Sequence, residues 1–353
     1  MLGIDRKAAR YTWTAVAVLL LVGLIYLVRS TLFVFTIALL FAYLLYPLVN
    51  LLDRALPWQR TRGLALALSY VILVCVAISG GVLIGSRVVD QAQTLSTKFP
   101  AMVASWSVEP APPAQDDLKG QIIANVREEV ARRANDLVGL LPAAGVKLMS
   151  VASDLIFVVL IPILAFFFLK DGEEIRAHIL SLADVGPWRT RLDAIMEDVH
   201  LLLAHYMRAL MMLSFATFVC YSIAFTVMGL PFGVLLAVIA MLLEIIPTLG
   251  PLAAAIIIIV VSAIGGAPVL AVIIFLLIYR LFQDYVLTPH LMGQGVQLHA
   301  LLVLFGVFAG AQVAGVAGSF LSVPLLALVR VLYLHLRRSR LSVPEAEPSR
   351  LVG

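Results

Sequence analysis

Charged residues are scarce in this 353-residue chain. Asp, Glu, Lys and Arg together make up 13% of it, and the mean hydropathy is +1.04. A soluble globular domain carries about 25% charged residues, so that class of protein is excluded. Hydrophobic residues make up 62% of the chain and gather in long runs. Such runs are typical of membrane helices, because a helix satisfies its own backbone hydrogen bonds inside the bilayer. We therefore predict an all-α, polytopic helical membrane protein whose first partner is the lipid bilayer.

Residue types that carry catalysis or bind cofactors are also rare. Cys75 and Cys220 are the two cysteines, and both lie inside apolar runs, which favours neither a disulfide framework nor a metal site. No GxxxxGK[ST] motif occurs, which argues against a nucleotide-driven pump. No nucleophile–base pattern is present, so we predict neither an enzyme nor a cofactor. The net charge of +4 does not indicate a nucleic-acid partner here, because Lys and Arg gather in cytoplasmic loops of membrane proteins.

The apolar runs define about eight membrane segments. Two tracts, 232–264 and 300–333, are too long for one span and are interrupted. We expect full-length spans at 12–29, 31–52, 63–85, 149–169, 205–229 and 268–288.

The first interrupted tract breaks at a turn that contains Pro247, Thr248, Gly250 and Pro251. Each arm has about 13–15 residues and reaches roughly 20–22 Å, which is short of a ~30 Å hydrocarbon core. The pattern predicts a re-entrant or broken helical hairpin, in which proline ends each arm and glycine permits the turn. Two short full spans are the alternative.

The second interrupted tract breaks between Gly315 and Gly318. Its two arms again have about 15 residues each, which predicts a second hairpin with these glycines at the turn. A continuous helix is the alternative, because glycines also serve to pack membrane helices closely.

Basic residues predict the orientation of the chain. With the N-terminus in the cytoplasm, the inner segments 1–11, 53–62, 170–204 and 334–353 carry three or four Lys and Arg residues each. The two hairpins then enter the membrane from opposite sides, which is the pattern of an inverted repeat around a midplane site. This orientation predicts that both termini are cytoplasmic. The predicted organisation is three membrane helices (1–85), an extracytoplasmic insert (86–148), a fourth helix (149–169), a cytoplasmic amphipathic linker (170–204), a transport core (205–335) and a basic tail (336–353).

Glu244 is the leading candidate for a functional residue. It lies about one helical turn before the break at Pro247, inside an apolar run. A carboxylate at membrane depth is costly, so it either couples transport to a proton or cation, or bonds to backbone N–H groups freed by the turn.

Further polar candidates lie near the inner end of the span 268–288. Arg280 and Asp284 are spaced i, i+4, so they can form a local ion pair or, alternatively, one of them can reach Glu244 or the substrate. Gln283 lies beside them, and Pro289 and Gly293 follow in the connection to the second hairpin. The candidate substrate or ion pathway therefore comprises Glu244, Pro247, Thr248, Gly250, Pro251, Arg280, Gln283, Asp284, Pro289 and Gly293.

Four motifs resemble those of the autoinducer-2 exporter family, also described as PerM-like permeases. They are the segments Phe-Phe-Phe-Leu-Lys-Asp-Gly (166–172), Glu-Ile-Ile-Pro-Thr-Leu-Gly-Pro (244–251) and Asp-Tyr-Val-Leu-Thr-Pro-His-Leu-Met-Gly (284–293), and a glycine-rich tract (306–318) followed by Val323-Pro324. The resemblance covers about residues 10–335. Members often have Asn where this chain has Asp284, so the chain adds a negative charge that favours cations.

The resemblance implies a multi-pass protein of the bacterial inner membrane that assembles as a homo-oligomer, with a pentamer as one form. Some members of the family export autoinducer-2, and others exchange sodium or lithium for protons. The leading hypothesis is therefore a secondary transporter or facilitator that exports a small polar signal or metabolite. One alternative is a monovalent cation/proton antiporter that uses Glu244 and Asp284. The other is a non-transporting oligomeric scaffold built on the insert 86–148.

Overall fold

The computed structural model describes residues 6–55, 62–108, 155–183, 186–292 and 298–341. Within these ranges the chain forms helices and turns, and no strand occurs among them. Gly293, residues 109–148 of the predicted insert and the start of the predicted span 149–169 lie outside them. The helices are α1 (Arg6–Leu27), α2 (Arg29–Ala55), α3 (Arg62–Gly80), α4 (Ser86–Val108), α6 (Leu155–Lys170), α7 (Gly172–Ser181), α8 (Pro187–Val227), α9 (Gly233–Leu243), α10 (Leu249–Ile264), α11 (Val269–Phe282), α12 (Thr288–Met292) and α13 (Ala300–Leu341).

Six stretches of helix are long and apolar enough to cross a membrane, counted over the described residues. Three shorter apolar helices accompany them, at Val159–Lys170, Gly233–Leu243 and Leu249–Ile264. The prediction of an all-α, polytopic membrane protein is confirmed. The orientation of the helices, and the side from which each hairpin enters, stay predictions.

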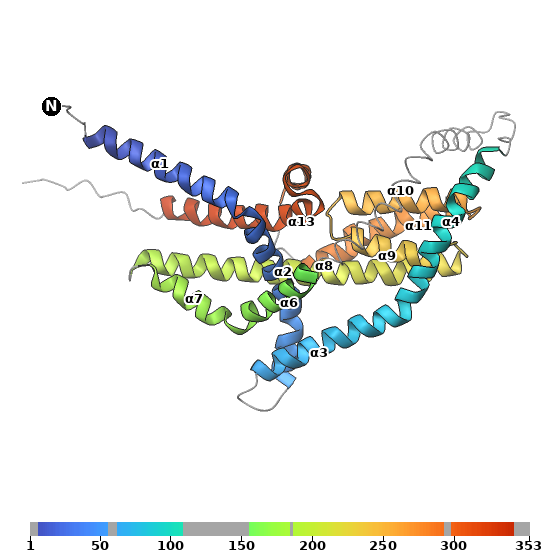
Figure 1. Cartoon of the computed structure of the whole chain (residues 1–353), viewed down its shortest axis with the longest axis horizontal. Coiled ribbons are helices and arrows are strands. Elements are labelled where there is room, and N and C mark those ends of the chain that lie inside the picture. Colours follow the sequence, from blue (N-terminus) through green and yellow to red (C-terminus); the bar gives the residue numbers. More distant parts are fainter. Residues whose placement is uncertain (1–5, 56–61, 109–154, 184–185, 293–297, 342–353) are drawn as a thin grey trace, which may run out of the picture.

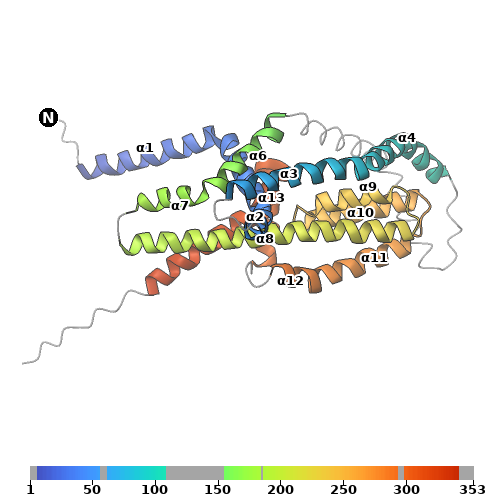
Figure 2. The ribbon, with the colours of Figure 1, turned by 90° about the horizontal axis from the view of Figure 1, so that it is seen from below.

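Helix α8 runs through the whole molecule, and the other helices are arranged along it (Figures 1 and 2). Helix α2 crosses the middle of α8, where Leu40 packs against Leu203 and Met207. Helix α7 lies beside the first half of α8, whereas α9, α10 and α11 surround the second half. The second half contains the largest core, built around Phe225 and Ile258, neither of which is exposed.

The length of α8 differs from the prediction. The sequence predicted a separate amphipathic helix (188–204) before a span (205–229), but one helix of 41 residues covers both. At 1.5 Å per residue it is about 61 Å long, roughly twice the hydrocarbon thickness. No glycine or proline follows Pro187 before the helix ends, so nothing in the sequence interrupts its backbone. The change near residue 204 from amphipathic to apolar sequence therefore does not mark the end of a helix.

The first hairpin is formed by α9 and α10. Thr248 at the turn has a positive φ of 66°, whereas Gly250 and Pro251 are helical and lie in the first turn of α10. A Cβ on Gly250 would lie 1.7 Å from the backbone oxygen of Leu243. Gly250 is therefore required for close approach of the two arms, and not, as predicted, for the conformation of the turn. Pro251 lacks an N–H at a position where the helix cannot use one.

The second hairpin is confirmed as a break within α13. Ala314 (φ −141°) and Gly315 (φ 61°, ψ −143°) leave the helical conformation, so the continuous-helix alternative is wrong. The arms then return against each other, since a Cβ on Gly310 would lie 2.3 Å from the backbone oxygen of Gly318. Ser319 Oγ also donates to the backbone oxygen of Val307, at 3.1 Å. Gly318 thus belongs to the interface between the arms and Gly315 to the turn.

Helix α4 is the described part of the predicted insert. A five-residue π-helical segment (Gly81–Gly85) joins it to α3, so the third span and the start of the insert form one continuous path. Leu95 of α4 is buried in the core of the first hairpin. Gln91 Oε1 accepts a hydrogen bond of 2.9 Å from the backbone N–H of Leu235. This bond satisfies one of the amide groups that the start of α9 leaves free.

Candidate functional site

Glu244 is the centre of a buried network of neutral polar groups. It ends α9, and only 8% of its surface is exposed. The side-chain amide of Gln283 donates to Glu244 Oε1. Thr217 Oγ1 donates to Glu244 Oε2 at 3.3 Å, and the hydroxyls of Thr217 and Tyr279 are 2.9 Å apart. Because the single proton of Thr217 is given to Glu244, the hydroxyl of Tyr279 is the donor to Thr217.

Three separate parts of the chain build this network, which we call the Glu244 network. Thr217 comes from the middle of α8, and Tyr279 from α11. Gln283 begins a π-helical segment (Gln283–Leu287) that follows α11 directly. Thr217 and Gln283 are 1% and 3% exposed, so the network is shielded from solvent on every side.

Aromatic rings enclose the network on the side of α8 and α11. Tyr221 lies 5.0 Å from Tyr279 and 5.3 Å from Phe275, measured between ring centroids, in edge-to-face geometry. Phe225 continues the group, with its centroid 5.2 Å from that of Tyr221. These contacts align α8 with α11 in this structure. Tyr279 is thereby held in position to donate to Thr217.

Arg280 and Asp284 form a local ion pair outside the network. Arg280 Nε lies 2.9 Å from Asp284 Oδ2, and the two side chains are 41% and 46% exposed. Of the two arrangements that the spacing allowed, the structure shows the local pair. No Lys, Arg or His of the described residues forms an ion pair with Glu244. The hydrogen bonds that the carboxyl group accepts among the described residues therefore come from neutral donors, Thr217 and Gln283.

The other predicted pathway residues have separate places. Pro247, Thr248, Gly250 and Pro251 form the turn that follows Glu244 and the first turn of α10. Pro289 lies in α12, which continues the π-helical segment, and is therefore helical. The structure thus brings Glu244 and Gln283 into direct contact, whereas Gly293 lies outside the described residues.

Thr217 and Tyr279 were not predicted. Both lie in apolar spans, where Thr and Tyr are common, so a single hydroxyl there does not indicate a functional site. Tyr279 precedes Gln283 by four residues, so the two share a helix face, and that spacing was the available signal. Thr217 had no such signal, because its partners lie 27 and 62 residues away.

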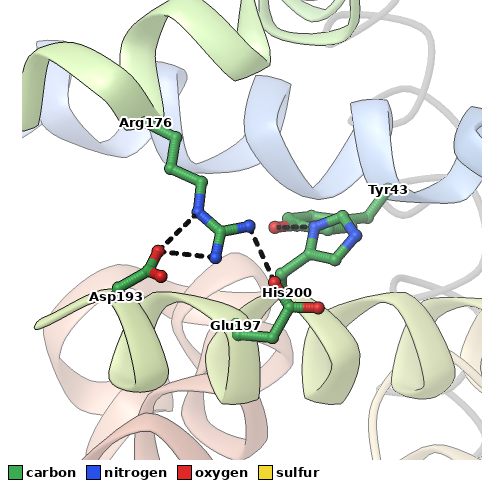
Figure 3. A network of polar contacts seen from close by, with 5 residues as sticks. All are labelled: Tyr43, Arg176, Asp193, Glu197 and His200. Carbon is green, nitrogen blue, oxygen red and sulfur yellow. Dashed lines mark hydrogen bonds and ion pairs between the residues drawn. The ribbon is translucent and has the colours of Figure 1, made fainter. Parts of the chain in front are cut away.

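A second polar network joins α2, α7 and α8, and Figure 3 shows it. Arg176 of α7 donates through Nε (3.0 Å) and Nη2 (2.7 Å) to Asp193 Oδ1. Its Nη1 donates to Glu197 Oε2 at 2.7 Å. The hydroxyl of Tyr43 lies 3.1 Å from His200 Nδ1. Hydrogen bonds to Asp193 and then Glu197 raise the pKa of Arg176 above its ordinary value.

Metal binding finds no support in the described ranges, where no three His, Cys, Asp or Glu side chains come together. Cys75 is exposed on α3, and Cys220 is half-buried on α8. The described part of the chain therefore offers a buried carboxyl network at a helix break rather than a metal centre.

These features define a class of protein. Multiple apolar helices, two broken hairpins and a buried carboxyl beside one of the breaks are typical of a membrane transport protein. The family model described as AI-2E family transporter matches residues 15–338, so the chain belongs to the AI-2E transporter family.

Relatives with curated names agree with this assignment. YrrI of Bacillus subtilis, whose name describes it as a putative transport protein, is 30% identical over 181 residues, or 51% of each chain. MT0215 of Mycobacterium tuberculosis, named in the same way, is 26% identical over 332 residues, which are 91% of this chain and 88% of the relative. The matches to YrrI and to YueF, also of Bacillus subtilis, span about half the length of those relatives.

Proposed function

We propose that this protein is a proton-coupled secondary transporter and that Glu244 takes up and releases the proton. The observation that carries the proposal is the surroundings of Glu244. It is buried among neutral donors, and no ion pair joins it to a cation among the described residues. An ionised carboxylate in such a place is costly, so a proton or a cation taken from the medium compensates its charge.

The position of Glu244 supports coupling to movement of the backbone. It ends the first arm of the hairpin, and the turn after it contains the positive φ of Thr248. Loss of the proton alters the bonds to Thr217 and Gln283, which belong to other helices. A change of charge at Glu244 therefore changes the contacts of the hairpin with α8 and α11.

For the substrate, we propose a small polar signal or metabolite of the autoinducer-2 type, exported across the inner membrane. The family description supports this substrate. Both termini would lie in the cytoplasm, which is supported by the basic residues of the inner segments. Assembly as a homo-oligomer, such as a pentamer, belongs to the same proposal and is supported by the family resemblance.

Monovalent cation/proton exchange is the second candidate function. Oxygen atoms of Glu244, Thr217 and Tyr279 gather at one point, and hard cations prefer oxygen ligands. In this version the cation and the proton compete for Glu244. Asp284 takes no direct part, because it is paired with Arg280.

The test is flux in proteoliposomes that enclose a pH-sensitive dye, with wild type, Glu244→Gln and the control Asp53→Asn. Asp53 is an exposed residue of α2, so its variant removes one charge far from the site. In wild type and in Asp53→Asn, we expect proton movement driven by the polar solute or by a sodium or lithium gradient. In Glu244→Gln, we expect this movement to fall to the level of protein-free liposomes. The driving species distinguishes the two functions. Wild-type flux in Glu244→Gln would contradict both, and it is the result that the scaffold alternative predicts.

A further inference from the structure

Helix α8 carries a short polar segment that holds two neighbouring helices on one face. Asp193, Glu197 and His200 are spaced i, i+4, i+7 and therefore lie on the same face. Arg176 of α7 binds both carboxylates, and Tyr43 of α2 binds the imidazole (Figure 3). The ring of Tyr46, also of α2, meets that of His200 edge-on, with centroids 5.1 Å apart.

A different face of the same segment holds the end of α13. Asp198 is about 100° further around the helix than its neighbour Glu197. His335 Nε2 lies 2.8 Å from Asp198 Oδ2. The segment 193–200 thus joins three helices that are far apart in the sequence. We call this set of contacts the α8 latch: Tyr43, Tyr46, Arg176, Asp193, Glu197, Asp198, His200 and His335.

The α8 latch and the Glu244 network are connected by one unbroken helix. His200 and Thr217 are 17 positions apart, about 26 Å along the axis. The intervening turns of α8 are packed on α2 and α13, with Tyr206 and Leu210 buried between them. A shift of α8 along its axis or a rotation about it therefore moves Thr217 relative to Glu244 by a similar amount.

The ion pairs around Arg176 in the α8 latch are accessible to solvent. Arg176, Asp193 and Glu197 are 38%, 49% and 46% exposed, so water and salt compete for each of them. Exposed ion pairs of this kind add little net stability, so a modest competition from salt is enough to break them. The Glu244 network, in contrast, is shielded from solvent. The contacts of α8 that can break in water are thus the ion pairs of Arg176, and not the hydrogen bonds of the Glu244 network.

We propose that the α8 latch sets the position of α8 and thereby controls whether Thr217 meets Glu244. This inference rests on the proposed function of Glu244. With the ion pairs of Arg176 made, α8 is held and the site is closed, as in this structure. When they break, α8 moves, Thr217 leaves Glu244 and the site opens.

Cys220 provides a built-in reporter of this movement. It lies on α8 three residues after Thr217, is half-buried and packs on the core around α9 and α10. In a Cys75→Ser background, the rate of maleimide labelling of Cys220 reports how tightly that part of α8 is packed. The variants are Arg176→Gln, the charge exchange Arg176→Glu with Glu197→Arg, and the control Arg189→Gln. Arg189 is exposed on α8 and takes part in none of the latch contacts.

We expect Arg176→Gln to raise the labelling rate of Cys220 by about two- to fivefold, which is the shift in population that one exposed ion pair can hold. The charge exchange restores the ion pair with position 197 but leaves Asp193 facing a carboxylate, so it should return the rate part of the way to that of wild type. Arg189→Gln should not change it. Coupled proton flux should fall in Arg176→Gln and recover in part in the charge exchange.

Salt dependence tests the same inference in the wild type, with Arg176→Gln as the reference. Raising the salt concentration shortens the Debye length from roughly 14 Å at about 0.05 M to roughly 4 Å at about 0.5 M. The labelling rate of Cys220 should rise with salt in the wild type and be constant in Arg176→Gln. Equal labelling of wild type and Arg176→Gln at all salt concentrations would overturn the α8 latch, even where Glu244→Gln abolishes flux. A latch-dependent labelling rate with no flux in any variant would support the latch and contradict the function proposed for Glu244.

Discussion

Two polar networks lie on helix α8, and they differ in almost every physical property. The Glu244 network is buried, contains one carboxyl group and has only neutral donors. The α8 latch is half-exposed and consists mainly of ion pairs around Arg176. A buried network loses stability when one partner is removed, because the remaining groups keep their desolvation cost. An exposed ion pair loses little, because water replaces the partner. The first network is thus suited to binding and the second to regulation.

The packing of the hairpin beneath Glu244 should give the largest effect of a single substitution. We expect Gly250→Ala to cost about 3 kcal/mol or more, because its new Cβ would meet the backbone oxygen of Leu243 and the arms would separate. Thermal unfolding of the purified protein in detergent, followed by size-exclusion chromatography, measures the loss.

Gly80→Ala is the matched control for this prediction. Gly80 is helical, and no atom lies within 4 Å of its ideal Cβ. Alanine in a helix is favoured over glycine by about 0.5–1 kcal/mol, so this variant should be equal to wild type or more stable. Equal unfolding midpoints for the two alanine variants would show that the arms of the hairpin do not need their close approach.

A substitution inside the Glu244 network should have the next largest effect. Thr217→Val keeps the shape of the side chain but removes the hydroxyl that joins Tyr279 to Glu244. Two buried polar groups then lose a partner, which costs about 1–3 kcal/mol. Thr217→Ser keeps the hydroxyl and should retain both flux and most of the stability. Flux and unfolding midpoints of the two variants, measured side by side, separate the hydrogen bond from the packing. Equal behaviour of valine and serine would contradict a role for the bond.

The sequence was sufficient for the features of the first network that are local. The lengths of the apolar runs predicted both broken helices, and the cost of a charge in the membrane selected Glu244. Residues 232–264 contain within themselves the two arms and the break, so no distant contact was needed to recognise them.

The sequence was insufficient for features that depend on how the helices pack. The partner of Glu244 on α8 is 27 residues away, and its choice depends on the register that Tyr221 and Phe275 impose between α8 and α11. The α8 latch is still less local, since His335 meets Asp198 across 137 residues. The predicted boundary near residue 204 also hid the fact that both networks lie on one helix.

The ion pairs of Arg176 should give the smallest effect on stability. We expect Arg176→Gln to lower the free energy of unfolding by about 1 kcal/mol or less, because its partners stay hydrated when it is removed. The difference in the free energy of unfolding between Arg176→Gln and wild type should shrink as salt is added, whereas the difference caused by Thr217→Val should not.

Raising the pH from 7 to 10 should leave the difference between Arg176→Gln and wild type unchanged. The pKa of Arg176 is raised in the folded state, so its contribution is complete below the ordinary arginine pKa and is lost only as the pH rises beyond it. Unfolding midpoints at two salt concentrations and at pH 7 and 10 measure all three expectations. A loss for Arg176→Gln as large as that for Thr217→Val would show that the α8 latch is a structural clamp, and the contrast between the two networks would then fail.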